Sequence, residues 1–473
     1  MTSQEILVAL LPVIILSSCA LLMMLVDSFM AHRRIFSFEI GILGYVAAVV
    51  AGIYNFQWQG TAFGGMIAFG GFANFFAVLF SMGGLLAFLF ARPYLKKENI
   101  NHAEFYCLLM FATVGMMLMA AAHDLIIVFI GLELMSISFY ILAGFARTTT
   151  SSNEAGLKYF LLGAFATGFL LYGIALVYGV TGSTNFDTIR GMLSSVNHQP
   201  MFWLGGALIF IAFAFKISAV PFHMWAPDVY EGAPTAVTGW MSSVGKAAAF
   251  SAVVLVGINI FGAGAEKFKI IVAVISTVTM LYGNITALMQ QNVKRMLAYS
   301  SIAHAGYALI GVAAASPLGS SAVLFYVATY VFMQAGAFGI AGEFEREGGK
   351  NLLISDYAGL GARKPMLAVI FAVFMFSLAG IPPLGGFFGK YYLFIAAVQS
   401  GMTWLAVVGV ISSIISIYFY IGLVVKMFFQ DAVSTEPLTV SGAGSIAMWL
   451  ACLAVFLLGI FPSAIVDTVI RLF

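Results

Sequence analysis

Residues 377–394 read SLAGIPPLGGFFGKYYLF, and they decide how the rest of the sequence is interpreted. The stretch lies inside a long apolar segment that otherwise has the composition of one continuous helix. Five residues interrupt the segment or follow the interruption: Pro382, Pro383, Gly385, Gly386 and Lys390. A proline in a helix interior removes one amide donor and leaves the carbonyl four residues earlier without its partner. The sequence therefore predicts a broken helix with a cation beside the break.

The composition of the chain indicates a membrane protein. Of its 473 residues, 62% are hydrophobic and 8% are charged, whereas soluble domains have about 45–50% apolar and about 25% charged residues. The net charge is +2, and no block of like charges forms a tail that would bind nucleic acid. The three cysteines lie in separate apolar segments, and the six histidines have no paired spacing. We therefore expect no disulfide, no metal site and no nucleic-acid partner.

The chain is expected to cross the bilayer fourteen times, because a span needs about 20 apolar residues. The candidate spans are residues 5–26, 35–55, 72–91, 104–121, 123–146, 154–180, 202–226, 234–260, 268–289, 295–314, 319–342, 365–395, 402–429 and 444–470. The first span lacks the basic start of a signal peptide, so we expect it to be retained. The longest connections, near residues 181–200 and 343–364, are expected to be loops. We predict an all-α polytopic membrane protein in which residues 1–473 form one domain.

The lysines and arginines of the connections predict the orientation in the membrane. Loops after odd-numbered spans carry thirteen of them: Arg33, Arg34, Arg92, Lys96, Lys97, Arg147, Lys294, Arg295, Arg346, Lys350, Arg363, Lys364 and Lys426. The opposite side carries four: Arg190, Lys267, Lys269 and Arg471. Cytoplasmic loops carry the excess of positive charge, so we expect both termini on the outer side.

Of the 21 lysines and arginines, four lysines are not assigned to a connection. Three of these lie well inside apolar spans: Lys216, Lys246 and Lys390. A charged side chain at bilayer depth costs roughly 2.5–3.5 kcal/mol on insertion scales, and such residues usually have a function. Burial disfavours the charged form of a lysine, which makes it able to exchange its proton. We interpret these three lysines as candidates for a proton relay. Lys158 is a secondary candidate, because it lies near a helix end from which its side chain can reach the interface.

Glu133 is the one acid that we place well inside a span. Asp124 stands at a helix start, where we expect it to cap the helix. If Glu133 lies about 10 Å from a lysine at an effective dielectric of about 20, their attraction is roughly 1.7 kcal/mol. Such an attraction would couple the two protonation states. A single buried histidine is often only a core residue. Beside three buried lysines, however, we include His304 in the predicted relay, with His223 as a secondary candidate.

A second stretch has the same design as the first, because Lys216 precedes Pro221 within the span 202–226. Broken backbone at bilayer depth is tolerated only where protein or water surrounds it, and we expect the freed carbonyls to hold water. Paired interrupted helices in two halves are typical of inverted repeats in transporters. We predict repeats over residues 104–260 and 268–429, flanked by residues 1–91 and 444–473.

A nucleotide-binding loop is excluded for GGFFGKYY. That motif needs glycine where Leu384 stands and serine or threonine where Tyr391 stands. No dinucleotide fingerprint and no haem motif occurs in the sequence. We therefore expect this chain to bind no redox cofactor.

Four stretches resemble the antiporter-like, proton-pumping subunits of respiratory complex I and of multisubunit cation/proton antiporters. They read GLELMSISFYILAGF, KISAVPFHMWAPDVYEGAPTAVTGWMSSVGKAAAF, QQNVKRMLAYSSIAHAGYALIG and SLAGIPPLGGFFGKYYLF. PDVYEGAPT and SSVGKAAAF are most similar to the N-type subunits, and Lys390 stands where M-type subunits usually carry glutamate. The chain also stops without the lateral extension of L-type subunits.

The resemblance implies a subunit of NADH-quinone oxidoreductase in a bacterial inner membrane, with discontinuous helices 7 and 12. It implies a relay of Glu133, Lys216, Lys246, His304 and Lys390. NADH, FMN, iron–sulfur clusters and quinone would be bound by partner subunits, and the other membrane-arm subunits would be the protein partners. Two alternatives stay open: a subunit of a cation/proton antiporter, and a structural subunit that conducts nothing.

Overall fold

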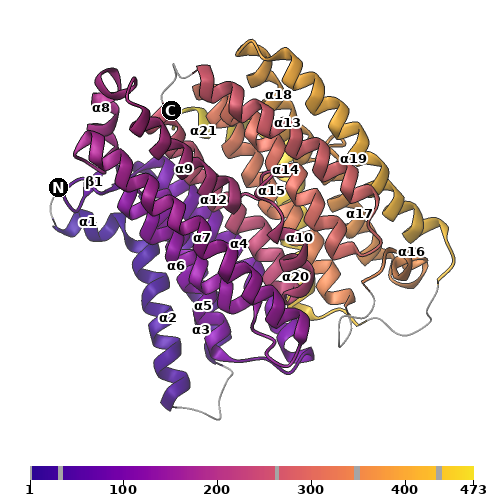
Figure 1. The fold of residues 1–473 in the computed structure, drawn as a ribbon. Coiled ribbons are helices and arrows are strands. Elements are labelled where there is room, and N and C mark those ends of the chain that lie inside the picture. Colours follow the sequence, from indigo (N-terminus) through magenta and orange to yellow (C-terminus); the bar gives the residue numbers. More distant parts are fainter. Residues whose placement is uncertain (1–2, 30–35, 262–265, 346–351, 433–438, 473) are drawn as a thin grey trace.

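The computed structural model describes residues 3–29, 36–261, 266–345, 352–432 and 439–472, and almost all of them are helical (Figure 1). Within these ranges, twelve helical segments are long and apolar enough to cross a membrane. Eleven are single helices: α2 (Leu11–Phe29), α3 (Phe36–Tyr54), α4 (Gly71–Lys97), α5 (Ala103–Ala120), α6 (Leu125–Ala143), α7 (Thr150–Thr181), α13 (Glu266–Leu288), α14 (Val293–Ala314), α15 (Pro317–Phe344), α19 (Thr403–Phe429) and α20 (Gly442–Ile460). The protein is thus an integral membrane protein.

The twelfth segment is a composite of four parts: α11 (Thr235–Trp240), the π-helical turn η2 (Met241–Gly245), α12 (Lys246–Val256) and a second π-helical turn, η3 (Gly257–Phe261). π-Helical turns inside α-helices are rare and often mark functional sites. Lys246 is the first residue after η2.

Both predicted helix breaks are present. The first separates α9 (Pro200–Lys216) from α10 (Trp225–Gly232), and Ser218 adopts a left-handed conformation with φ of 61°. The predicted span 202–226 was therefore too short, since α10 continues it to residue 232. The second break separates α17 (Pro365–Ala379) from α18 (Gly385–Gln399), and Gly380 has φ of 87°. With these two pairs, the helical segments correspond in position to the fourteen predicted spans; the number of crossings stays a prediction.

The remaining elements lie at the ends of the long helices: α1 (Ser3–Ala9), η1 (Asn55–Gln57), β1 (Gly60–Ala62), β2 (Ile67–Phe69), α8 (Phe186–Val196), η4 (Ile354–Tyr357), α16 (Leu360–Arg363) and α21 (Pro462–Ile470). The prediction of loops was wrong for both long connections, because residues 181–200 contain α8 and residues 343–364 contain η4 and α16. The connection before α4 contains an antiparallel hairpin in which Thr61 pairs with Ala68. Asp124 caps α6 as expected, because its side chain accepts a hydrogen bond from the Ile126 amide.

Four of the positive residues used for the orientation lie outside the described residues: Arg33, Arg34, Arg346 and Lys350. Most of the others lie in helices and not in loops: Arg92, Lys96 and Lys97 in α4, Arg190 in α8, Lys267 and Lys269 in α13, Arg363 in α16 and Lys426 in α19. Lys294 and Arg295 belong to the first turn of α14, and the Lys294 side chain is almost completely buried. Its ammonium donates to the carbonyl of Ala233 at 2.9 Å.

Helix α15 forms the centre of the bundle (Figure 1). It is buried along the whole of its apolar window, and it packs against α4, α11, α14, α17, α18 and α20. Both termini of the break between α17 and α18 therefore lie beside a helix that never meets lipid. This position satisfies the rule that broken backbone at bilayer depth is surrounded by protein.

Gly386 in the first turn of α18 provides a test of this packing. A Cβ atom at this position would lie 1.9 Å from the carbonyl oxygen of Ser377, and backbone atoms cannot rotate away as a side chain can. We expect Gly386→Ala to lower the melting temperature of the detergent-purified protein, since overpacking costs about 1–3 kcal/mol.

Gly422 in α19 is the matched control, because a Cβ there would meet nothing within 4 Å. Gly422→Ala should leave the melting temperature unchanged or raise it, because alanine is the better helix former. Equal melting temperatures for the two variants would contradict the close approach at Gly386.

Candidate functional site

Lys390 occupies the place of the amides that the two prolines lack. In an unbroken helix the carbonyls of Leu378 and Ala379 would accept from the amides of residues 382 and 383, which are both prolines. The Lys390 ammonium instead donates to both carbonyls, at 3.1 and 3.0 Å. The break and the cation of residues 377–394 are therefore one unit.

Two further contacts complete this unit. Lys390 also donates to the Ser413 hydroxyl of α19 at 2.8 Å, so each of the three donors of an ammonium has an acceptor. Lys390 is 4% exposed. The lysine is thus a partner of the Leu378 and Ala379 carbonyls, and the water that we expect at the break stays a prediction.

Lys246 lies at the centre of a second polar group. Its ammonium donates to the Ser301 carbonyl at 2.7 Å and to the Ser301 hydroxyl at 2.5 Å. The Tyr330 hydroxyl of α15 donates to the same serine at 2.8 Å. The residue after the π-helical turn η2 is thus linked to both α14 and α15.

His304 is held between two tyrosines. Its Nδ1 is 2.5 Å from the Tyr326 hydroxyl, and its Nε2 is 3.1 Å from the Tyr420 hydroxyl. The His304 ring also lies near two other aromatic rings, with centroids 5.1 Å from Tyr330 and 5.8 Å from Tyr307. Because both ring nitrogens meet hydroxyl groups, the histidine is positioned to exchange protons on either side.

The rings of Tyr330 and Tyr307 connect the three groups in space. Tyr330 contacts both the Ser301 group and the His304 ring. Tyr307 contacts the His304 ring, and the Lys390 ammonium lies 4.7 Å from the centre of the Tyr307 ring. The structure therefore brings Lys246, His304 and Lys390 together in one cluster, in which two tyrosine rings connect the three groups.

Lys216 belongs to a separate cluster in the first half of the chain. As the last residue of α9, it donates to the hydroxyls of Ser136 at 2.7 Å and Tyr140 at 3.2 Å, both on α6. It also lies 5.2 Å from the centre of the Tyr140 ring and 5.4 Å from that of Tyr159. The buried cation is thus stabilised by hydroxyls and aromatic faces.

Glu133 and Lys216 are neighbours without a direct contact. Among the described residues, no ion pair within 4.0 Å joins them. Glu133 instead accepts from the Thr167 hydroxyl of α7 at 2.7 Å. Ser136, which binds Lys216, lies three residues after Glu133 on α6, and residues at this spacing are neighbours on one face of a helix. The through-space coupling of the acid and the lysine stays a prediction.

His223 lies in the turn between α9 and α10, away from both clusters. It is buried, its Nδ1 has no hydrogen-bond partner among the described residues, and its ring centre is 4.6 Å from that of Tyr282. Within the described part of the chain, no hydrogen bond joins the His223 side chain to Lys216 or Lys246. The structure does not bring this secondary candidate into the relay.

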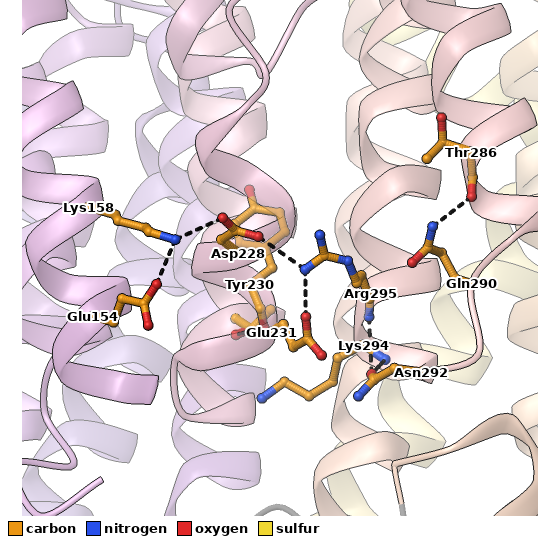
Figure 2. A network of polar contacts seen from close by, with 11 residues as sticks. Glu154, Lys158, Asp228, Tyr230, Glu231, Thr286, Gln290, Asn292, Lys294 and Arg295 are labelled. Atoms are coloured by element: carbon orange, nitrogen blue, oxygen red, sulfur yellow. Dashed lines mark hydrogen bonds and ion pairs between the residues drawn. The ribbon is translucent and has the colours of Figure 1, made fainter. Parts of the chain in front are cut away.

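Lys158 belongs to an ion-pair network at the end of the helices (Figure 2). It pairs with Glu154 at 2.6 Å and with Asp228 at 3.0 Å. Asp228 also binds Arg295 at 3.1 Å, and Arg295 binds Glu231 at 2.6 Å. Lys158 is therefore an ion-pair residue that connects α7 to α10, and through Asp228 to α14.

Sequence reasoning missed the hydroxyl groups that surround the buried cations: Ser136, Tyr140, Ser301, Tyr307, Tyr326, Tyr330, Ser413 and Tyr420. One signal was available. Ser300, His304 and Tyr307 recur at spacings of three and four, as do Tyr326 and Tyr330, which places each set on one helix face. Among the described residues, no group of histidine, cysteine and acidic side chains has the arrangement of a metal site.

Comparison with known proteins identifies the family to which the chain belongs. The family described as NADH:quinone oxidoreductase/Mrp antiporter, TM, matches residues 122–416, which include every residue of both clusters except Tyr420. The chain belongs to this family. The matched range also contains both helix breaks.

Curated members of the family are similar over nearly the whole chain. NADH-quinone oxidoreductase subunit N of Trichlorobacter lovleyi is 44% identical over 461 residues, which cover 97% of this chain and 95% of that protein. Subunit N 1 of Chloroherpeton thalassium is 46% identical over 460 residues, covering 97% and 96%. The resemblance to N-type subunits that the sequence predicted is confirmed.

Solved structures of the family share the fold. A chain of respiratory complex I from Thermus thermophilus with bound aureothin has a TM-score of 0.84 and 32% identity, covering 96% of this chain and 98% of that chain. A chain of the Mrp complex from Dietzia sp. DQ12-45-1b has a TM-score of 0.89 at 22% identity, covering 99% and 97%. At that identity the second likeness shows the fold alone. The predicted all-α polytopic fold is confirmed, apart from the small β1–β2 hairpin.

The Lys390 unit predicts a loss of stability when the amine is removed. Lys390→Met keeps a long side chain but leaves the buried carbonyl of Leu378 without its donor and that of Ala379 with the Ser413 hydroxyl alone. An unsatisfied buried group costs about 1–3 kcal/mol. We expect a lower melting temperature in detergent. Lys426→Met at the end of α19 removes a partly exposed lysine and should change the melting temperature far less. The reverse order would refute the assignment of Lys390 as partner of the freed carbonyls.

Proposed function

We propose that this chain is the N-type, antiporter-like subunit in the membrane arm of NADH:quinone oxidoreductase, and that it translocates protons. The observation that carries the proposal is the cluster of Lys246, His304 and Lys390, in which each buried titratable group binds a serine or tyrosine hydroxyl and the rings of Tyr330 and Tyr307 lie between the groups. A hydroxyl can accept one proton while it gives up another. Such a cluster suits stepwise proton transfer better than it suits packing.

The proposed relay begins at Glu133 and Lys216. Electron transfer in partner subunits would change the interaction between these two side chains, and this change would alter the proton affinity of the groups further along. Protons would then pass from Lys246 through His304 to Lys390. Moving one charge against 100 mV requires about 2.3 kcal/mol, which corresponds to a change of less than two pKa units.

Lys390 would couple proton release to the backbone. As an ammonium it has three donors and uses all three, on Leu378, Ala379 and Ser413. A neutral amine has one donor fewer, so loss of a proton removes one of the three contacts. Either a carbonyl at the end of α17 loses the lysine, or the Ser413 hydroxyl turns away from the Ala379 carbonyl, to which it donates at 3.3 Å, and donates to the amine.

We place the chain in a bacterial inner membrane, with both termini on the outer side and the lysine-rich and arginine-rich loops in the cytoplasm. Residues 104–260 and 268–429 would be the inverted repeats. NADH, FMN, the iron–sulfur clusters and quinone would be bound by partner subunits, and the other membrane-arm subunits would surround this chain. Among the described residues there is no cluster suited to a metal.

A cation/proton antiporter subunit is the second candidate, because the Mrp complex chain has the same fold. The relatives named subunit N favour the first candidate, since their identity to this chain is about twice as high. Copurification separates the two. Flavin-bearing and iron–sulfur-bearing subunits should accompany the chain in the first case and be missing in the second.

The proposed relay predicts that Glu133→Ala and Lys390→Ala impair proton pumping. Both variants should lower dye-monitored pumping in inside-out membrane vesicles, and the coupled NADH–quinone reductase activity with it, by about tenfold, which corresponds to about 1.4 kcal/mol. Rates are divided by the content of assembled complex on native gels, because Lys390→Ala also weakens the helix break. Wild-type pumping in both assembled variants would rule out the assignment.

The Lys216 cluster predicts different effects for two serines on α6. The Ser136 hydroxyl accepts from Lys216, whereas the Ser138 hydroxyl only donates to the Leu134 carbonyl of its own helix. We expect Ser136→Ala to slow pumping several-fold, because it removes one hydrogen bond to a buried cation. A hydrogen bond to a charged group contributes about 1.5–3 kcal/mol. Ser138→Ala should pump like the wild type. Equal rates for the two variants would remove Ser136 from the relay.

A further inference from the structure

The polar clusters described so far do not explain how a proton reaches Lys246. Helices α4, α11 and α15 pack against one another on the other side of this lysine. Between them lie two spaces and several buried polar atoms that neither the relay nor the helix breaks use. The inference drawn from these features rests on the proposed function, and it extends that function to the side from which protons are taken up.

The larger space is a cavity of about 330 Å³ at the ends of α4 and α15. Lys97, Glu343 and Glu345 line it, together with Ser441 before α20. This end of the molecule is the one that carries most lysines and arginines, which we place in the cytoplasm. The cavity is large enough for several water molecules, since one water needs about 10–15 Å³ of such volume.

Glu345 is the buried acid of this cavity, and sequence reasoning overlooked it. It is 5% exposed, although it directly follows α15. Its carboxylate accepts from the Thr235 hydroxyl, and its carbonyl accepts from the Lys97 ammonium. Thr235 is the first residue of α11, the segment that continues to Lys246.

The smaller space lies further in and has a volume of about 10 Å³, enough for about one water molecule. Thr235 lines it, so the Thr235–Glu345 hydrogen bond joins the two spaces. Phe90 lines both spaces. A Cβ on Gly339 would lie 2.3 Å from its ring, which shows how closely the ring packs on α15.

Two buried polar atoms beyond the Phe90 ring have no hydrogen-bond partner among the described residues. They are the indole N–H of Trp240, which lines the smaller space, and the side-chain oxygen of Gln334, which precedes the lining residue Ala335. Trp240 is 2% exposed and Gln334 is 0% exposed. Buried polar groups without a protein partner are usually satisfied by water.

Gln334 lies next to the Lys246 cluster. It is four residues after Tyr330 on α15, and its amide donates to the Leu297 carbonyl, four residues before Ser301 on α14. Tyr330 and Ser301 are the two residues that meet at Lys246. Glu345 is eleven residues from Gln334, which corresponds to about 16 Å along the helix, and Thr235 and Trp240 lie between these levels on α11.

We propose that the seam between α4, α11 and α15 is the proton-uptake route to Lys246, in which Glu345 binds the proton at the cytoplasmic end and Gln334 holds a water molecule in place at the inner end. Water molecules between Thr235 and Gln334 carry the proton across the interval. The Phe90 ring closes the route, and its displacement opens it. Each step moves a proton from one oxygen atom to the next, the last water passes it to the neutral amine of Lys246, and no other reactant is needed.

Glu345→Gln and Gln334→Leu test the route in the assembled complex in inside-out vesicles. Glu345→Gln keeps the size of the side chain and an acceptor for Thr235 but cannot exchange a proton, and Gln334→Leu removes the inner polar group. Both should lower proton pumping about tenfold relative to the amount of assembled complex. The solvent isotope effect of heavy water on the coupled reductase should rise, because proton supply becomes limiting. Glu345→Asp should restore most of the rate.

Two matched controls separate the route from general damage. Glu343→Gln changes an acid that lines the same cavity but binds Ser441, and Ser321→Ala removes a buried hydroxyl of α15 that donates to its own helix. Both should pump like the wild type. Wild-type pumping by Glu345→Gln or by Gln334→Leu, alongside a defective Lys390→Ala, overturns the route and leaves the proposed function intact. Normal pumping by Lys390→Ala overturns the proposed function instead.

Discussion

The structure depends on one constraint: a backbone carbonyl at bilayer depth must have a donor. Each unsatisfied polar group there costs several kcal/mol, so two adjacent prolines inside a helix create two carbonyls that need partners. Lys390 supplies both donors from the far side of the break. The same contact gives a buried cation its acceptors. Helix break and buried charge, each costly alone, satisfy one another.

This constraint explains why the break lies where it does. A break stabilised by one side chain must also exclude lipid, and α15, which is buried along its whole apolar window, lies beside it. The Tyr307 ring of α14 and the Ser413 hydroxyl of α19 then contact the lysine, and Tyr326 of α15 binds the neighbouring His304. The polar cluster and the helix break are therefore parts of one packing arrangement.

The sequence predicts those parts of the site whose placement at bilayer depth costs free energy, namely buried charges and helix breaks. Prolines within apolar spans and lysines at bilayer depth stand out in a chain with 8% charged residues, which is why Lys216, Lys246 and Lys390 were identified correctly as buried. Serine and tyrosine are common in apolar helices, so Ser301 or Tyr330 cannot be distinguished before the helices are packed. Glu345 and Lys294 were missed for another reason. They lie at span ends, where a sequence suggests exposure and only the tertiary packing shows burial.

The two lysines beside the breaks differ in the atoms that they bind, and this difference separates their roles. Lys216 binds the hydroxyls of Ser136 and Tyr140, which can reverse from acceptor to donor when the lysine loses a proton. Lys390 binds two backbone carbonyls, which can only accept. A change of charge at Lys216 is therefore accommodated by rotation of hydroxyl groups. At Lys390 the same change removes a donor from the end of α17 unless Ser413 turns, so its protonation state is coupled to the geometry of the helix break itself.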